Sequence, residues 1–203
     1  RSLVTLFAAA ATVGLVSEFL VGAVDAAGTS LGVGKVFMGV VGVGGIGRGV
    51  ADKPPAFGMS VAYTARRDAG IPNASQMTLD RLLATSDVIS LHCPMTPETK
   101  HLIDQKALTK MKRSAYLVNT SRGPVVDEAA LAWALKERLI AGAALDVYEN
   151  EPQIHPGLMS LENALLIPHL ASATTETRTA MADLAVTNAI AVLNGRPPVT
   201  PVP

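Results

Sequence analysis

The chain has 203 residues, 49% of them hydrophobic and 17% charged, which suffices for one large or two small domains around a sizeable core. Its 17 lysines and arginines balance its 17 acidic residues, so it lacks the positive footprint of a protein that binds nucleic acid or anionic membranes, and we expect a small-molecule partner and no nucleic acid. A single cysteine, Cys93, excludes an internal disulfide and predicts a reducing, cytoplasmic location.

The first predicted element is a long apolar segment, Leu3 to Val24, which contains one charged residue, Glu18. Its length fits a transmembrane or signal-like segment as well as a helix of a globular core. Because Glu18 would be costly at bilayer depth, we favour a long, mostly buried helix and expect no membrane partner. The chain begins at Arg1 rather than at methionine, which is expected of a truncated sequence.

A glycine-rich turn follows the apolar run Lys35 to Val41 and reads Gly42-Val43-Gly44-Gly45-Ile46-Gly47. Gly42 permits a tight turn, Gly44 lets the backbone approach a pyrophosphate, and Gly47 allows a helix to pack closely on the strand. The helix, expected from about Ile46, would present its unpaired N–H groups to the phosphates. The turn therefore predicts a dinucleotide site formed by Gly42, Gly44, Gly45, Ile46 and Gly47.

Two features qualify this prediction. A chain with 17 glycines can also contain such a turn for structural reasons alone. Pro54 and Pro55 cannot sit in a helix interior, so we expect the helix after the glycines to be short or broken near Lys53.

The next predicted strand, Ser60 to Thr64, bears on the choice of cofactor. An NAD site usually has an acid about 20 residues past the glycines, where it binds the ribose 2′-hydroxyl. Here the strand is followed by Ala65, Arg66 and Arg67, and guanidinium groups suit a 2′-phosphate. The pattern favours NADP(H) over NAD(H), which remains possible, and the alternative is a pair of solvated surface arginines.

The remaining elements alternate between helices and strands. We expect helices at Leu79 to Thr85, Asp104 to Met111, Asp127 (as cap) through Leu139, and Thr175 to Leu193, and strands at Asp87 to His92, Ala115 to Asn119, Ala141 to Val147, and Ala164 to Pro168. Such alternation predicts an α/β fold with a doubly wound, Rossmann-type parallel sheet covered on both faces.

Three ionisable residues follow the later apolar runs: Arg122, Glu151 and His169. In a doubly wound sheet, ligands bind at the carboxyl ends of the strands, where these residues should converge. Arg122 would bind a substrate carboxylate, and His169 would donate a proton to the substrate carbonyl oxygen. Glu151, if it touches the imidazole, would raise the pKa of His169, and Asp146 could accept a hydrogen bond from a nicotinamide amide.

Each of these residues, taken singly, is more often an ordinary surface or loop residue. The remaining histidines show no partner pattern, and no metal-ligand spacing appears, so we predict no metal.

Longer motifs surround these residues. They read Ser90-Leu91-His92-Cys93-Pro94-Met95-Thr96-Pro97-Glu98-Thr99, Asn119-Thr120-Ser121-Arg122-Gly123-Pro124-Val125-Val126-Asp127-Glu128, Leu145-Asp146-Val147-Tyr148-Glu149-Asn150-Glu151-Pro152, and Pro168-His169-Leu170-Ala171-Ser172-Ala173-Thr174. In sequence, order and spacing they resemble the D-isomer-specific 2-hydroxyacid dehydrogenases, over roughly Gly39 to Pro203. Within that family the chain is most similar to the glyoxylate/hydroxypyruvate reductases.

The resemblance implies a role for each matching position. Arg122 would bind the substrate carboxylate, and Glu151 and His169 would form the acid/base pair. Substrate binding would involve Arg122, His169 and Ser172. The cofactor cleft would be lined by Cys93, Pro94, Thr120 and Asp146 in addition to the glycine turn and Arg66 and Arg67.

The resemblance also sets expectations for the domains and their activity. Residues 1–34 would be a divergent remnant of the interdomain helix and substrate domain, 35–170 the dinucleotide-binding domain, and 171–203 a C-terminal helix and tail returning toward the substrate domain. Family members carry a longer N-terminal substrate domain, most of which is missing here. The leading hypothesis is an NAD(P)H-dependent 2-keto acid reductase, expected as a homodimer. The alternative is a dinucleotide-binding module without turnover, like the corepressor proteins that share the fold, or a decayed paralogue.

Overall fold

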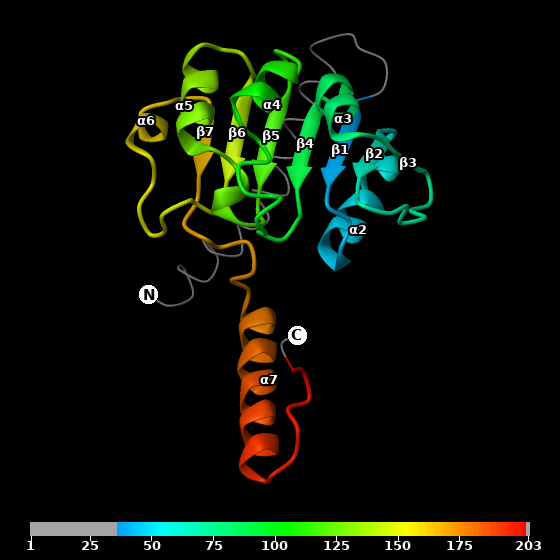
Figure 1. Ribbon diagram of the computed structural model, residues 1–203, viewed down its shortest axis with the longest axis vertical. Helices are drawn as coiled ribbons and strands as arrows, with labels where there is room; N and C mark the ends of the chain where they lie inside the picture. The colour runs from blue at the N-terminus through cyan, green and yellow to red at the C-terminus, as the bar shows by residue number, and fades with distance from the viewer. Residues whose placement is uncertain (1–35, 202–203) are drawn as a thin grey trace. The chain divides into compact units, whose positions relative to one another are not determined.

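The structure is a computed structural model in which residues 36–201 are described (Figure 1). This part of the chain falls into two compact units, residues 36–168 and 169–201, and each is described by itself. The apolar segment Leu3 to Val24 and the expected domain remnant at residues 1–34 lie outside the described residues.

A parallel seven-stranded sheet forms the centre of the first unit, in the order β3-β2-β1-β4-β5-β6-β7 (Figure 1). Its strands are β1 Phe37–Val41, β2 Ser60–Thr64, β3 Ala74–Gln76, β4 Val88–Leu91, β5 Tyr116–Asn119, β6 Gly142–Leu145 and β7 Ala164–Leu166. The sheet reverses its direction of growth at β1, which pairs with β2 on one side and β4 on the other. The predicted doubly wound sheet is thereby confirmed.

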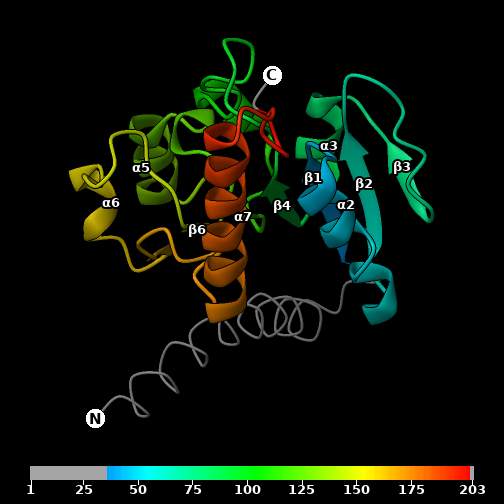
Figure 2. The same ribbon diagram turned by 90° about the horizontal axis from the view of Figure 1, so that it is seen from below.

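Helices connect the strands and cover the sheet. They are α2 Gly45–Ala51, η1 Pro54–Phe57, α3 Leu79–Thr85, α4 Gln105–Lys110, η2 Gly123–Val125, α5 Glu128–Lys136 and α6 Pro156–Met159. In Figures 1 and 2, α3, α4 and α5 lie side by side over one face of the sheet. The larger apolar core lies beneath them, around Leu82, Ile89, Leu108, Leu117 and Leu135. A smaller core that includes Val40, Ala51 and Tyr63 joins β1 and β2 to α2.

Threonine or aspartate side chains cap three of these helices, as the residue types predict. Thr78 accepts the N–H of Arg81 at 3.4 Å, and Asp104 accepts that of Ala107 at 2.8 Å. Asp127 accepts the N–H of Ala130 at 2.9 Å, which confirms the predicted cap of α5. Each cap satisfies an N–H group that has no partner within the helix.

The sequence predicted where two helices end, and one of these two predictions is confirmed while the other is wrong. The helix after the glycines ends at Ala51, before the two prolines, so the prediction of a short helix is confirmed. The prediction that α5 runs through Leu139 is wrong, because the helix stops at Lys136. Arg138 adopts a left-handed φ of 53°, and the Leu139 N–H then donates to the Ala134 carbonyl, which closes the helix end.

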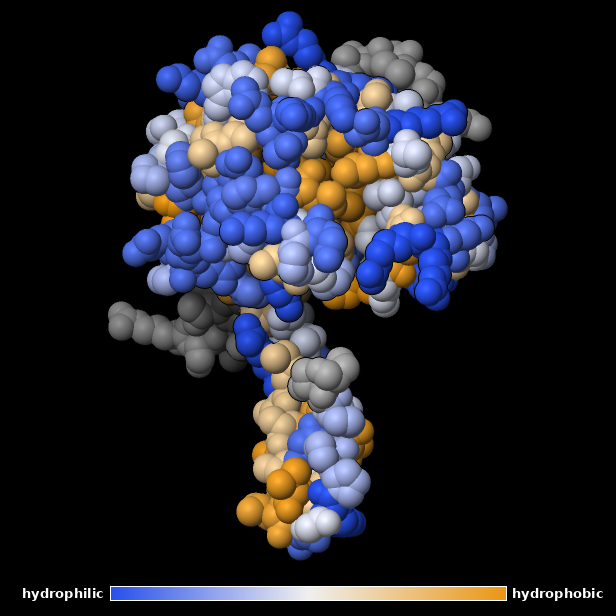
Figure 3. Space-filling view, in the orientation of Figure 1, coloured by the Kyte–Doolittle hydropathy of each residue, from blue (hydrophilic) through white to orange (hydrophobic). Residues whose placement is uncertain are grey.

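The second unit consists mainly of α7, Thr175–Leu193, and the tail that follows it. The tail folds back along the helix, where the Asn188 side chain bonds the Thr200 hydroxyl at 2.8 Å and the Thr200 N–H at 3.1 Å. Apolar side chains along α7 are exposed (Figure 3), among them Met181, Leu184 and Ile190. Within residues 36–201, no helix combines the length and apolarity needed to cross a membrane.

Candidate functional site

The carboxyl ends of the parallel strands bring most of the predicted site residues to one edge of the sheet. The glycine turn follows β1, Arg66 and Arg67 follow β2, Cys93 and Pro94 follow β4, Thr120 and Arg122 follow β5, and Asp146 follows β6. The crevice at the point where strand order reverses, here between β1 and β4, is where such sheets bind ligands. The order of elements therefore places the predicted cofactor and substrate residues of the first unit at the ligand-binding edge.

The glycine turn has the geometry that a phosphate cradle requires. Gly42 adopts a φ of 87°, and a Cβ there would lie 2.6 Å from the Cys93 nitrogen. A Cβ on Gly47 would overlap the Gly42 carbonyl oxygen, so helix and strand meet there as closely as predicted. A Cβ on Gly44 or Gly45 would meet nothing, which leaves this side of the helix start open. The turn thus fits a dinucleotide phosphate approaching the N–H groups of α2.

The loop after β2 presents its two arginines to solvent and keeps its one acid engaged. Arg66 and Arg67 are both exposed. The Asp68 carboxylate accepts the Tyr63 hydroxyl and the Gly70 N–H, and the first of these bonds lowers the pKa of Asp68. The loop therefore has two solvent-exposed guanidinium groups, whereas the Asp68 carboxylate is held by the Gly70 N–H and the Tyr63 hydroxyl.

Cys93 lies beneath the glycine turn. It is 8% exposed, and burial raises the pKa of its thiol above the ordinary value. The Nε2 of the neighbouring His92 and the Ser90 hydroxyl share a hydrogen bond of 2.8 Å. Burial lowers the pKa of His92. Cys93 packs against Gly42 and the His92 side chain lies close to Gly47, whereas Pro94 is exposed.

The turn that carries Arg122 is shaped by the fully buried side chain of Asn119. Its oxygen accepts the Ser121 N–H at 3.1 Å and the Ser121 hydroxyl at 2.9 Å, while its amide donates to the Arg122 carbonyl at 3.1 Å. The exposed Arg122 guanidinium donates to the Ser121 carbonyl at 2.6 Å. Arg122 is thus displayed at the sheet edge on a turn that its neighbour holds rigid.

The segment after β6 carries Asp146 and Glu151. Asp146 is 2% exposed, and Glu151 is exposed and accepts the Tyr148 N–H at 3.1 Å. Burial raises the pKa of Tyr148 to about 12, with the Asp146 carboxylate adding to the rise. Its neutral hydroxyl donates to the Ile167 carbonyl at 2.9 Å, which ties this segment to the end of β7.

The turns that carry Arg122 and Glu151 meet at Gly123. A Cβ there would overlap the carbonyl carbon and oxygen of Tyr148 and approach the Glu149 nitrogen to 2.5 Å. Only glycine permits this approach of two backbones. The structure therefore brings the Arg122 turn and the segment leading to Glu151 into direct contact.

His169 and Ser172 stand at the start of the second unit, shortly after β7. His169 has a φ of 52°, in the left-handed region, where a residue other than glycine is often held for a functional reason. A contact between His169 and Glu151 would join residues of different units, and it stays a prediction.

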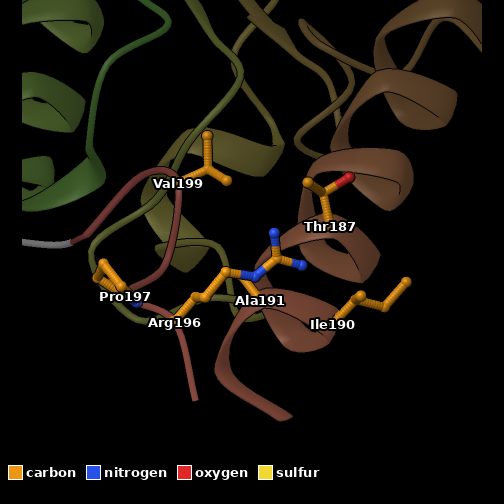
Figure 4. Close-up of a pocket in the computed structure, with 6 residues that line it drawn as sticks. All are labelled: Thr187, Ile190, Ala191, Arg196, Pro197 and Val199. Atoms are coloured by element: carbon orange, nitrogen blue, oxygen red, sulfur yellow. The ribbon is translucent and has the colours of Figure 1, made fainter. Parts of the chain in front are cut away.

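One further hollow, of about 390 Å³, lies within the second unit (Figure 4). It is lined by Thr187, Ile190, Ala191, Arg196, Pro197 and Val199, and in Figure 4 the Arg196 side chain extends across it toward Thr187. None of these is a predicted site residue. Among residues 36–201, no group of three acidic, histidine or cysteine side chains is arranged to bind a metal ion.

Two residues that shape the site received no role from the sequence: Asn119 and Gly123. Both belong to the same motif as Arg122. A polar residue at the end of an apolar strand is a signal that could have indicated that Asn119 is buried and hydrogen-bonded to the turn. The contact of Gly123 with Tyr148 joins residues distant in sequence, so no local signal reveals it.

In a comparison with known protein families, residues 24–171 match the family described as D-isomer specific 2-hydroxyacid dehydrogenase, NAD binding domain. The chain is 51% identical over 168 residues to a glyoxylate reductase of Thermofilum pendens, covering 79% of this chain and 49% of that protein. It is 46% identical over 165 residues to glyoxylate/hydroxypyruvate reductase B of Erwinia tasmaniensis, covering 78% and 51%. The chain thus spans about half the length of these relatives.

Solved structures show the same likeness. A glyoxylate reductase from Paecilomyes thermophila matches with a TM-score of 0.77 and 41% identity, over 83% of this chain and 52% of that one. An NADPH-dependent glyoxylate/hydroxypyruvate reductase from Sinorhizobium meliloti, solved with NADP and malonate, matches with a TM-score of 0.79 and 38% identity, over 83% and 53%.

Proposed function

The chain belongs to the D-isomer specific 2-hydroxyacid dehydrogenase family, and from that premise we propose that it reduces a small 2-keto acid, glyoxylate or hydroxypyruvate, to the 2-hydroxy acid with NADPH. The observation that carries the proposal is the packing of the Arg122 turn against the segment that leads to Glu151, beside the glycine turn at the same sheet edge. The names of the relatives support the substrate class. The dinucleotide, when bound, supplies the hydride for the reduction.

The residues of this chain would divide the remaining work. The Arg122 guanidinium bonds one carbonyl through a single nitrogen, which leaves other donors for a substrate carboxylate. His169 would donate a proton to the keto oxygen, and Glu151 would stabilise the charged imidazole. Ser172 would assist in substrate binding. A homodimer and a cytoplasmic location remain predictions.

Cofactor binding would fall to residues that follow β1, β2, β4, β5 and β6 at the same edge of the sheet. Gly42, Gly44, Gly45, Ile46 and Gly47 would hold the phosphates, with Cys93, Pro94, Thr120 and Asp146 lining the cleft. The exposed Arg66 and Arg67 would pair with the 2′-phosphate, since the acid of their loop is already engaged. The relative solved with NADP is described as NADPH-dependent, which supports this preference.

The direct test mixes the purified chain with NADPH and either glyoxylate or hydroxypyruvate and follows NADPH absorbance. We expect NADPH oxidation that depends on both the chain and the keto acid, and NADPH binding detectable by its fluorescence. NADPH binding without turnover would replace the reductase by a dinucleotide-binding module. If the chain did not bind NADPH at all, both the reductase and the dinucleotide-binding module would be excluded.

Replacing both arginines, as Arg66→Ser with Arg67→Ser, is expected to weaken NADPH binding about ten- to hundredfold, because charge-assisted hydrogen bonds to the 2′-phosphate are lost. NADH affinity should stay within about threefold, because NADH has no 2′-phosphate for these residues to bind. Fluorescence titration with both cofactors measures the change. The exposed Arg113, which precedes β5 at the opposite edge of the sheet, provides the matched control Arg113→Ser. Equal losses for NADH and NADPH would show that the pair has no role in cofactor choice.

A further inference from the structure

A cluster of charged side chains links α5 to the segment after β6, close to the proposed site. Glu128, at the start of α5, is 4% exposed, and its carboxylate accepts the Glu149 N–H at 2.6 Å and the His155 N–H at 3.1 Å. The Glu149 carboxylate in turn accepts the Glu128 N–H at 3.2 Å. Each glutamate thus binds the backbone of the other, and we call this pair the carboxylate clasp.

His101 closes the clasp from a third segment. Its Nε2 lies 2.5 Å from the Glu149 oxygen that does not accept the Glu128 N–H, and its Nδ1 lies 4.0 Å from a carboxylate oxygen of Asp127. Its backbone N–H donates to the Pro124 carbonyl at 2.8 Å. His101 adopts a left-handed φ of 50°, a conformation that the surrounding contacts must hold in place.

The clasp joins the two segments that carry the proposed substrate-binding and acid/base residues. On one side, Arg122 stands directly before η2, and α5 begins at Glu128. On the other side, Tyr148 and Glu149 lead to Glu151, whose carboxylate accepts the Tyr148 N–H. Because Gly123 brings the two backbones into contact, a change in the clasp shifts one segment against the other.

We propose that Glu128, Glu149 and His101 are positioning residues that hold Glu151 in register with Arg122, an inference that rests on the proposed reductase function. None of the three binds substrate or cofactor in this scheme. Charge-assisted hydrogen bonds are short and strong, and the buried Glu128 has both oxygens occupied by backbone donors. A displacement of about 1 Å between groups that act on one substrate can lower a rate about a hundredfold.

Glu128→Gln tests the proposal with little change of volume. Glutamine can accept one of the two N–H groups but turns its own NH₂ toward the other, so one end of the clasp opens. We expect kcat/KM for glyoxylate to fall about ten- to hundredfold, while the NADPH dissociation constant stays within about threefold. Glu137→Gln, an exposed position near the end of the same helix, is the control and should leave both values unchanged.

Two variants at His101 separate a lost hydrogen bond from a lost side chain. His101→Gln keeps an N–H donor for Glu149, whereas His101→Ala removes it, and both carry the same left-handed backbone. We expect His101→Gln to retain most of kcat/KM and His101→Ala to lose about tenfold. Equal values for the two would overturn the role of His101.

Amide hydrogen exchange separates failure of this inference from failure of the proposed function. If the parent chain does not turn over glyoxylate, the reductase proposal falls, and exchange at the Tyr148 N–H still reports the position of Glu151. In Glu128→Gln we expect that amide to exchange at least about tenfold faster, with the amides of the core strand β5 unchanged. Unchanged exchange at Tyr148, or an equal rise at every amide together with weaker NADPH binding, would show that the clasp serves only general stability.

Discussion

Gly123→Ala is expected to be among the most destabilising single substitutions in this chain, lowering the free energy of unfolding by about 3 kcal/mol or more. The added methyl group would overlap the backbone of Tyr148 and Glu149, which no side-chain rotation can relieve. The η2 turn and the segment after β6 would have to separate, which also disrupts the reciprocal bonds of Glu128 and Glu149. Urea denaturation followed by circular dichroism measures the loss.

Gly49→Ala supplies the matched control for this substitution. A Cβ at Gly49 meets nothing, and the residue lies within α2. Alanine favours a helix interior over glycine, so this variant should gain up to about 1 kcal/mol. A Gly123→Ala variant within about 1 kcal/mol of the parent would mean that the two backbones have room to part.

His169→Ala is expected to lower the turnover of glyoxylate about a hundred- to ten-thousandfold, because the proposed proton donor is removed. NADPH affinity should change little, since the cofactor cradle belongs to the glycine turn and the loop after β2. Steady-state NADPH oxidation gives the rate, and fluorescence titration gives the affinity.

His155→Gln is the companion histidine variant. The His155 ring accepts the Gly157 N–H at the start of α6, an acceptor role that glutamine can keep. Its turnover should stay close to that of the parent. A His169→Ala variant as active as His155→Gln would exclude His169 as the proton donor.

Local signals predicted the fold well wherever they were complete. The helix Leu79–Thr85 follows a capping threonine, and Thr175–Leu193 is followed by Gly195, so both match their predicted bounds. Strand β3, Ala74–Gln76, was missed because its three residues show no apolar alternation. It forms through pairing with β2, which is a tertiary effect rather than a local preference.

The strand-end positions of the predicted site residues follow from the sequence, but the distances between them do not. The turn of Gly42 and the strand-end position of Arg122 follow from motif and topology. The hydrogen bonds between Glu128 and Glu149 link residues that are 21 positions apart. Neither motif contains a pattern that predicts that each carboxylate binds the backbone of the other residue. Charged residues in loops are mostly solvated, so only the folded arrangement distinguishes this pair.

The burial of Cys93 under the glycine turn makes this thiol a natural reporter of local opening. Its backbone lies against Gly42, and its raised pKa keeps the sulfur in the unreactive, protonated form. As the one cysteine of the chain, it gives a single, unambiguous alkylation signal. The rate of that alkylation therefore rises with the fraction of molecules in which local opening exposes the thiol, and a dinucleotide that holds the turn in place would lower this rate.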